Sequence, residues 1–257
     1  MFQGDMVMNA AQLKHMEESK LAGSFESTDI MENAETELQY LWPNNELKYQ
    51  LDINISSNHK DRIRNTLKNL ERNLGSCIRF VEASYGPRVY VKDNSSKGCS
   101  SEIGYQSKLK QSLNLAKNCM RTGKIQHEFL HALGLYHTQS RSDRDKYVEI
   151  IWKNIKNGTE DNINSNKINF MVYGGKTYGL PYDIGSVMHY PDYAFGIKDG
   201  RGSQHVTIKA VLPSNQDKMG QREGVSPGDI EMLRRHYECY KQTTTTTTTG
   251  RLKLYNE

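Results

Sequence analysis

The segment that most constrains this chain is HEFLHALGLYH, which begins at His127. His127 and His131 are four residues apart, so on a helix both imidazoles lie on the same face and can bind one metal ion. Gly134 can adopt a positive φ and end that helix sharply. The sharp end allows His137 to return to the same ion as a third ligand. Three histidine ligands with one position left open are typical of catalytic zinc rather than of a closed structural site.

Glu128 adds a base to this cluster. It directly follows the first histidine and can reach a metal-bound water without binding the metal itself. The full pattern HExxHxxGxxH is the signature of metzincin proteases, and ordinary histidines on an amphipathic helix are the weaker interpretation. The other histidines have no such spacing and are interpreted as surface or structural residues: His15, His59, His189, His205 and His236.

A second motif, Ser-Val-Met-His-Tyr, lies about 50 residues after the third histidine and is centred on Met188. Metzincins carry a methionine turn downstream of the zinc motif. Alone, this stretch would indicate a core methionine. With the zinc motif upstream, we expect Met188 to form a polarisable packing floor beneath the metal.

Short periodic segments indicate a mixed fold. Apolar residues spaced by four, three and four predict one helix face over residues 63–74, and Gly75 is a stop signal. Strands are predicted over residues 77–81, 89–91 and 112–115. A capping-box variant, Ser226-Pro227-Gly228-Asp229, predicts the start of a last helix that closes near Cys239. Because strands and helices do not alternate regularly, the expected class is α+β.

Composition divides the chain into three parts. Only 36% of the 257 residues are apolar, which favours one core with polar extensions over a single core that includes the whole chain. Residues 1–32 have a net charge of −4 and residues 33–240 a net charge of +6. Residues 241–257 include seven consecutive threonines and form a predicted linker or tail.

The overall charge and hydropathy exclude several function classes. A formal net charge of +4 is too mild to indicate nucleic acid or a membrane surface as the partner. No apolar run approaches the roughly 18 residues of a membrane span. The first residues lack the apolar core of a signal peptide, so either none existed or the chain begins after it.

Four cysteines without CxxC spacing favour two disulfides over a cysteine zinc site, and the residues alone leave their pairing open. Disulfides indicate an oxidising compartment. Three glycosylation sequons, at Asn54, Asn94 and Asn157, agree with secretion. We therefore expect a secreted glycoprotein.

Taken together, these residues resemble the astacin family of metzincin proteases over almost the whole of residues 42–239. Beyond the zinc motif, the resemblance includes Trp42-Pro43-Asn44, Cys77-Ile78-Arg79-Phe80-Val81, Arg141-Ser142-Asp143-Arg144-Asp145-Lys146-Tyr147-Val148, Tyr182-Asp183 and Gly220-Gln221-Arg222. It implies two subdomains around a horizontal cleft, with a twisted mixed sheet and the zinc helix in one and a C-terminal helix in the other. It also implies the disulfides Cys77–Cys239 and Cys99–Cys119. The strand near residues 112–115 resembles the edge strand that pairs with extended substrate.

The same resemblance implies zinc-assisted hydrolysis of peptide bonds in protein substrates. Glu128 would accept the proton of the attacking water and pass it to the leaving amine. Tyr190 matches the family's tyrosine ligand, which leaves the metal and stabilises the oxyanion. Arg222 is a candidate for a pocket that selects an acidic residue just after the cut bond. A monomer is expected.

The leader also resembles a family element. Phe2-Gln3-Gly4-Asp5 is similar to the FxGD motif of astacin pro-segments, in which the aspartate binds zinc in place of the catalytic water. A carboxylate is a good zinc ligand, and displacing the water removes the nucleophile. The resemblance therefore implies a latent pro-enzyme that requires an activating protease or autolysis.

Two positions depart from the family pattern. Astacins commonly have Glu after the third histidine, where it ties down the new N-terminus, whereas this chain has Thr138. They are commonly cut after a basic residue, whereas Glu32 precedes the corresponding Asn33-Ala34. These departures predict activation without a trypsin-like cut before Asn33 and without the usual burial of the new amine. N-terminal sequencing and a structure of the activated protein would test both.

Two other function classes compete with the protease. The chain could be a zinc-holding binding module that has lost catalysis, or a purely structural secreted domain. A zinc-holding binding module would not need the base Glu128. A purely structural domain would not need three histidines around a metal. The protease is therefore the favoured interpretation.

Overall fold

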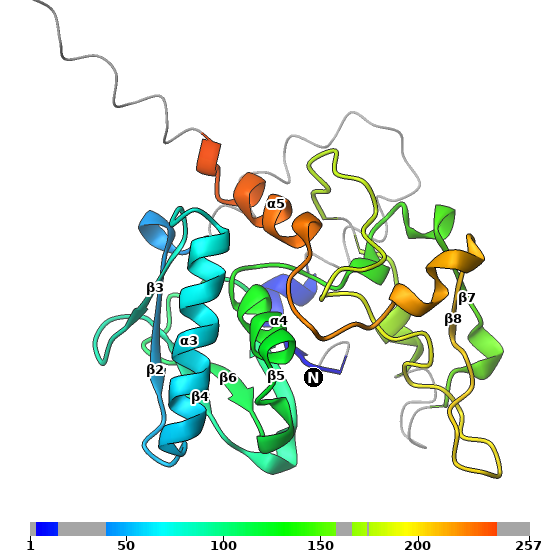
Figure 1. The fold of residues 1–257 in the computed structure, drawn as a ribbon, viewed down its shortest axis with the longest axis horizontal. Helices are drawn as coiled ribbons and strands as arrows, with labels where there is room; N and C mark the ends of the chain where they lie inside the picture. The colour runs from blue at the N-terminus through cyan, green and yellow to red at the C-terminus, as the bar shows by residue number, and fades with distance from the viewer. Residues whose placement is uncertain (1–3, 15–39, 158–165, 174, 241–257) are drawn as a thin grey trace, which may run out of the picture.

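The computed structural model describes residues 4–14, 40–157, 166–173 and 175–240 (Figure 1). Several expectations lie outside these residues: Phe2 and Gln3 of the leader motif, His15, the Glu32-Asn33 junction and the threonine-rich tail. Within the described part, no helix is long and apolar enough to cross a bilayer.

The larger sheet has six strands in the order β1-β5-β6-β4-β2-β3. Every neighbouring pair is parallel except β5 and β6. The strands are β1 (Met6–Val7), β2 (Glu46–Leu51), β3 (Arg79–Glu82), β4 (Val89–Lys92), β5 (Cys99–Glu102) and β6 (Gln111–Leu115). Three of them correspond to the strands predicted from the sequence, with bounds that differ by one or two residues.

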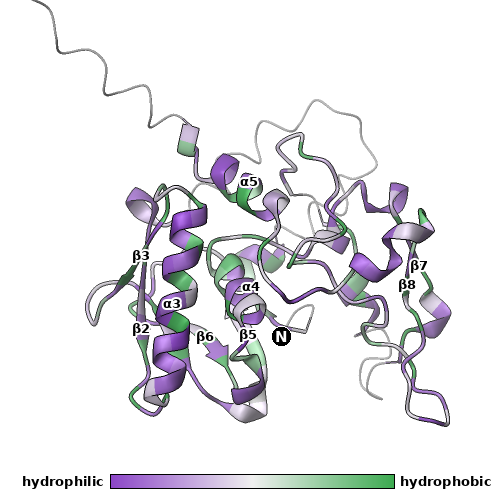
Figure 2. Ribbon diagram, in the orientation of Figure 1, coloured by the Kyte–Doolittle hydropathy of each residue, from purple (hydrophilic) through white to green (hydrophobic). Residues whose placement is uncertain are grey.

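Two helices pack with this sheet to form the main core. Helix α3 (Ser57–Asn73) begins six residues before the predicted helix, at the cap Ser56, and ends where Gly75 adopts a φ of 67°. Its apolar stripe, visible as green bands in Figure 2, is buried against the sheet and α4 (Thr122–Ala132). The core therefore holds α4, the helix that carries the zinc motif, from several sides.

One expectation about this sheet is wrong. The strand at residues 112–115 is not at the edge, because β6 lies between β4 and β5. Within residues 40–240 the two outer strands are β5 and β3, and the leader strand β1 covers β5. The sequence of β5, CSSE, has no alternating apolar pattern to mark it as a strand, which is why residues 112–115 were the better sequence candidate.

The second half of the chain is mostly irregular. It contains a small antiparallel sheet of β7 (Val148–Ile150) and β8 (Ile208–Ala210), and the helix α5 (Pro227–His236). Ser226 and Asp229 form the predicted capping box. A second apolar cluster around Phe170 and Ile208 fills this half up to Met219, whereas Leu233 of α5 belongs to the main core; the α+β class and the two subdomains are both confirmed.

Both disulfides have the pairing that the resemblance implies, Cys77–Cys239 and Cys99–Cys119. They close loops of 162 and 20 residues, which by chain entropy stabilise the fold by roughly 5 and 3 kcal/mol. The longer one joins the turn between α3 and β3 to the segment just after α5.

Candidate metal centre

Helix α4 delivers the first two histidines, as the four-residue spacing predicts. It is buried along almost its whole length, and its end is capped by Leu133. Gly134 then adopts a φ of 103°, which only glycine accepts without strain. A Cβ at Gly134 would lie 2.9 Å from Nε2 of His236, so the ring on α5 also requires glycine here. This turn directs His137 back toward the helix.

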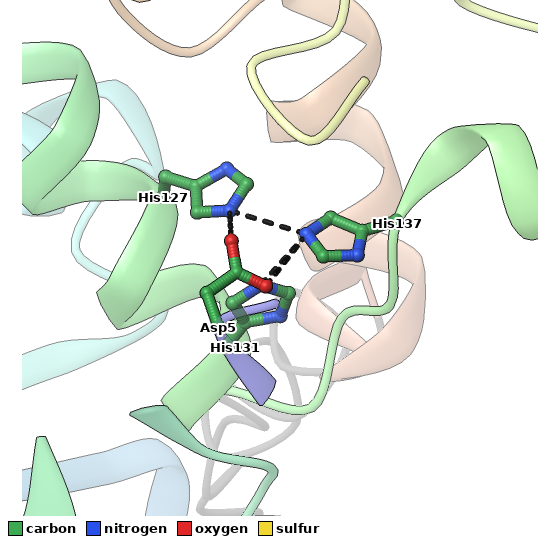
Figure 3. A group of neighbouring side chains, drawn as sticks. All are labelled: Asp5, His127, His131 and His137. Atoms are coloured by element: carbon green, nitrogen blue, oxygen red, sulfur yellow. Dashed lines mark hydrogen bonds and ion pairs between the residues drawn. The ribbon is translucent and has the colours of Figure 1, made fainter. Parts of the chain in front are cut away.

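The three imidazoles meet through their Nε2 atoms (Figure 3). Nε2 of His137 lies 3.2 Å from that of His131 and 3.3 Å from that of His127. The first two rings donate from Nδ1 to backbone carbonyls, His127 to Val187 and His131 to Leu135. Their Nε2 atoms therefore carry lone pairs directed toward one another, an arrangement that a cation at the centre stabilises.

Asp5 of the leader supplies the fourth group (Figure 3). Its carboxylate oxygens lie 3.1 Å from His127 Nε2, 3.2 Å from His137 Nε2 and 3.7 Å from His131 Nε2. A tetrahedral zinc with ligands at about 2.1 Å has ligand–ligand edges of about 3.4 Å. The four donors therefore fit zinc in both type and spacing.

The pKa values of the acidic and histidine side chains at the centre are shifted by burial and by one another. Burial raises the pKa of the Asp5 carboxyl, but the charge of His137 and the close polar contacts with His127 and His137 outweigh it and hold that pKa well below its usual range. Burial lowers the pKa of His127 and, more strongly, that of His131, which keeps these imidazoles neutral as metal binding requires.

Glu128 is almost completely buried beside the histidines. Burial and the nearby Asp5 charge raise the pKa of its carboxyl well above the usual value, although Arg222 and Lys124 oppose the shift. Its Oε2 has no hydrogen-bond partner among the described residues. A buried carboxylate oxygen of this kind suits a group that exchanges protons with substrate and water.

The Met188 turn is hydrogen-bonded to the residue that follows His137, and a packing floor beneath the metal stays a prediction. Met188 is 1% exposed, and its carbonyl accepts the backbone N–H of Thr138. Asp229 of α5 accepts from Ser186 Oγ and Val187 N, and Thr138 Oγ1 also bonds Ser186. The C-terminal helix thus fixes the turn whose carbonyl orients His127, a connection that the sequence did not reveal.

Tyr190 packs its ring against that of His137, with ring centroids 4.6 Å apart. Burial and the Asp5 charge raise the pKa of its phenol well above 10. Phe195 contacts both Tyr190 and the leader, since a Cβ at Gly4 would lie 2.9 Å from the phenyl ring. The glycine of the leader motif, with a φ of 85°, is therefore sterically required.

The leader is held by more than Asp5. Ser101 N donates to Asp5 O, and β1 continues parallel to β5. The side-chain oxygens of Asn9 and Gln12 each accept the backbone N–H of the other residue. The Asn9 amide also donates to Gln106 Oε1, and the Gln12 amide donates to Ile103 O. Sequence reasoning identified Asp5 but missed these anchors, because their partners lie about 90 residues away.

Arg222 is half-buried near the centre, and its Nη1 donates to the carbonyls of His189 and Gln221. Burial lowers the pKa of its guanidinium. His189 has a structural role, donating to Tyr190 O and accepting from Tyr182, and burial lowers its pKa to about 4. His236 is also structural, through Gly134 and Tyr178.

The predicted glycosylation sites Asn54, Asn94 and Asn157 all have exposed side chains. Such exposure is what a glycan attachment site needs. Thr159, the hydroxyl residue of the third sequon, lies outside the described residues.

Comparisons with known proteins agree with this geometry. The family model described as Astacin, a peptidase family, matches residues 34–238. Zinc metalloproteinase nas-4 of Caenorhabditis elegans is 31% identical over 92% of this chain and 69% of its own length. Meprin A subunit beta of Homo sapiens is 33% identical over 93% of this chain but only 30% of its own length. The structure of high choriolytic enzyme 1, a hatching enzyme zinc-protease from Oryzias latipes, is similar with a TM-score of 0.66 and 33% identity, covering 78% of this chain and 96% of that one.

Proposed function

Since this chain belongs to the astacin family of zinc metalloendopeptidases, we propose that it is a secreted endopeptidase held latent by its own leader. The observation that supports latency best is the position of the Asp5 carboxylate opposite three histidine Nε2 atoms. Two disulfides and three exposed sequon asparagines support secretion.

The leader blocks the site in two ways under this proposal. Asp5 fills the ligand position that an attacking water needs. Strand β1 pairs with β5, which would be an edge strand without the leader, and so takes up the backbone groups that an extended peptide would use. Removal of the leader would free the metal and the sheet edge together, so a single cut would be enough to activate the enzyme.

Catalysis then depends on three groups of the chain. His127, His131 and His137 hold zinc, and the chemistry of the bound ion is that of a Lewis acid that makes water nucleophilic near neutral pH. Glu128 accepts the proton of the attacking water and gives it to the leaving amine. The phenol of Tyr190 donates a hydrogen bond to the oxyanion and is a candidate fifth ligand in the active form.

A casein assay tests the proposed function. A site for a sequence-specific protease is inserted between Glu32 and Asn33, and the zinc content is measured before and after cutting. We expect the uncut protein to be silent and the cut protein to hydrolyse casein, with activity lost in chelator and restored by zinc. A cut protein that keeps zinc but leaves casein intact would instead indicate the zinc-holding binding module.

We also propose that Arg222 selects an acidic residue just after the cut bond. The positive charge of Arg222 interacts with Glu128 and Asp5, so it would also attract a substrate carboxylate near the metal centre. In a peptide library we expect acidic enrichment at that position, and Arg222→Gln should reduce it about tenfold. The exposed Arg201→Gln is the matched control. A wild-type cleavage profile without acidic enrichment would contradict this proposal. Arg222 would then have only a structural role, through its hydrogen bonds to the carbonyls of His189 and Gln221.

A further inference from the structure

A cluster of basic side chains surrounds an open hollow of about 470 Å³ between the starts of α3 and α4. In Figure 1 both helices begin at the lower end of the view. The residues that line the hollow are His59, Arg62, Lys117, Asn118, Met120, Arg121 and Lys124. None of them is acidic, so the lining carries four permanent positive charges.

These cations are not neutralised within the described part of the chain. Arg62 donates to the carbonyl of Met120, and Lys124 to that of Asn118, but no side chain of the cluster forms an ion pair there. The nearest acid in sequence, Asp61, pairs with Arg64. The starts of α3 and α4 add the positive ends of two helix dipoles to the same field.

The arrangement of the charges distinguishes between kinds of anion. Arg62, Lys117 and Arg121 are exposed, so each makes a weak, solvent-screened contact. Such contacts become useful when many anionic groups on one chain meet them together, because their contributions add. An extended polyanion therefore fits this hollow better than a single small anion.

Apart from Lys124, the basic residues of this cluster lie outside the zinc centre. Lys124 lies one helical turn from Glu128 and its charge acts on that carboxyl, whereas Lys117 and Arg121 belong to the segment before α4. A ligand on Lys117 and Arg121 would thus bind without entering the metal site.

We propose that the hollow is a binding surface for a sulfated polysaccharide, contacted by Arg62, Lys117, Arg121 and Lys124. Preference for this polyanion over nucleic acid follows from the two disulfides and rests on the proposed secretion. The inference is independent of proteolysis. Such a surface would hold the enzyme on an extracellular polysaccharide while leaving Glu128 and the histidines accessible.

Binding of a heparin decasaccharide to the full chain, titrated at several salt concentrations, tests this proposal. We expect affinity to fall steeply with salt, and K117E/R121E to weaken binding at least about tenfold and flatten the salt dependence. The matched control K153E/R201E makes the same charge change at two exposed residues outside the cluster and should lower affinity less than about twofold. K117A/R121A repeats the test without charge reversal in case the first variant folds poorly.

Three results would overturn the proposal. Wild-type protein could fail to bind the decasaccharide at low salt, or both charge-reversal double variants could lose affinity equally, which would indicate net charge alone. A DNA duplex or phosphatidylserine vesicles could also bind as tightly as the decasaccharide at equal anion concentration. Casein hydrolysis by cut K117E/R121E, expected to equal that of cut wild type, separates failure of this surface from failure of the protease.

Discussion

Glu128→Gln is expected to leave zinc bound to the three histidines and to lower the rate of peptide hydrolysis by about 10²- to 10⁴-fold, the usual contribution of a general base. The amide has almost the shape of the carboxyl but cannot accept the proton of the attacking water. Because Glu128 is not a metal ligand, the metal content should not change. Casein hydrolysis by the cut protein and metal analysis of the same sample measure the two effects.

The matched control for this substitution is Gln126→Glu, on the same helix. Gln126 is also buried, and its Oε1 accepts the backbone N–H of Val225, so that variant places an acid in α4 without touching the site. It should retain zinc and most of its activity, with some loss of stability. If cut Glu128→Gln kept its rate, the assignment of Glu128 as base would be wrong.

Asp5→Ala is expected to activate the uncut chain by about 10- to 100-fold. If Asp5 binds the zinc as proposed, its loss should weaken the block by at least the 10- to 100-fold that residues hydrogen-bonded to metal ligands contribute to metal affinity. Pairing of β1 with β5 persists in this variant, so activity should stay below that of the cut wild type. The measurement is casein hydrolysis by intact protein, with gel analysis to confirm that the leader is still attached.

Leu13→Ala is the control for Asp5→Ala, because Leu13 is an exposed leader residue. It should leave the uncut chain silent. Asp5→Asn should behave like Asp5→Ala, since a neutral amide is a poor zinc ligand. An uncut Asp5→Ala protein that binds zinc normally yet remains silent would show that the leader blocks the site by covering the sheet edge alone.

The sequence predicted the metal centre well because its information is local. The spacing of His127 and His131, and the glycine before His137, determine the geometry within eleven residues. The capping box at Ser226 is local for the same reason. These features follow from helix periodicity and the permitted φ values of glycine.

What the sequence did not predict depends on distant contacts. Strand β5 has no apolar pattern in its sequence. Its polar residues Ser100, Ser101 and Glu102 are nevertheless buried, and β1 of the leader pairs with the strand. The hydrogen bonds that orient His127 and brace the Met188 turn come from residues 42 to 60 positions away. No periodic signal encodes such partners, so the edge strand was assigned wrongly and the bracing was missed.

Because the leader is part of the same chain as the site, its binding depends on the covalent connection between them. Among the described leader residues, strand β1 has only two residues, and the polar anchors include Asp5, Asn9 and Gln12. While the chain is intact, these contacts act at an effective concentration of about millimolar. A cut between Lys14 and Tyr40 makes the leader a separate peptide, and dilution then favours its release. Latency would therefore be lost without any change in the affinity of the leader for the site.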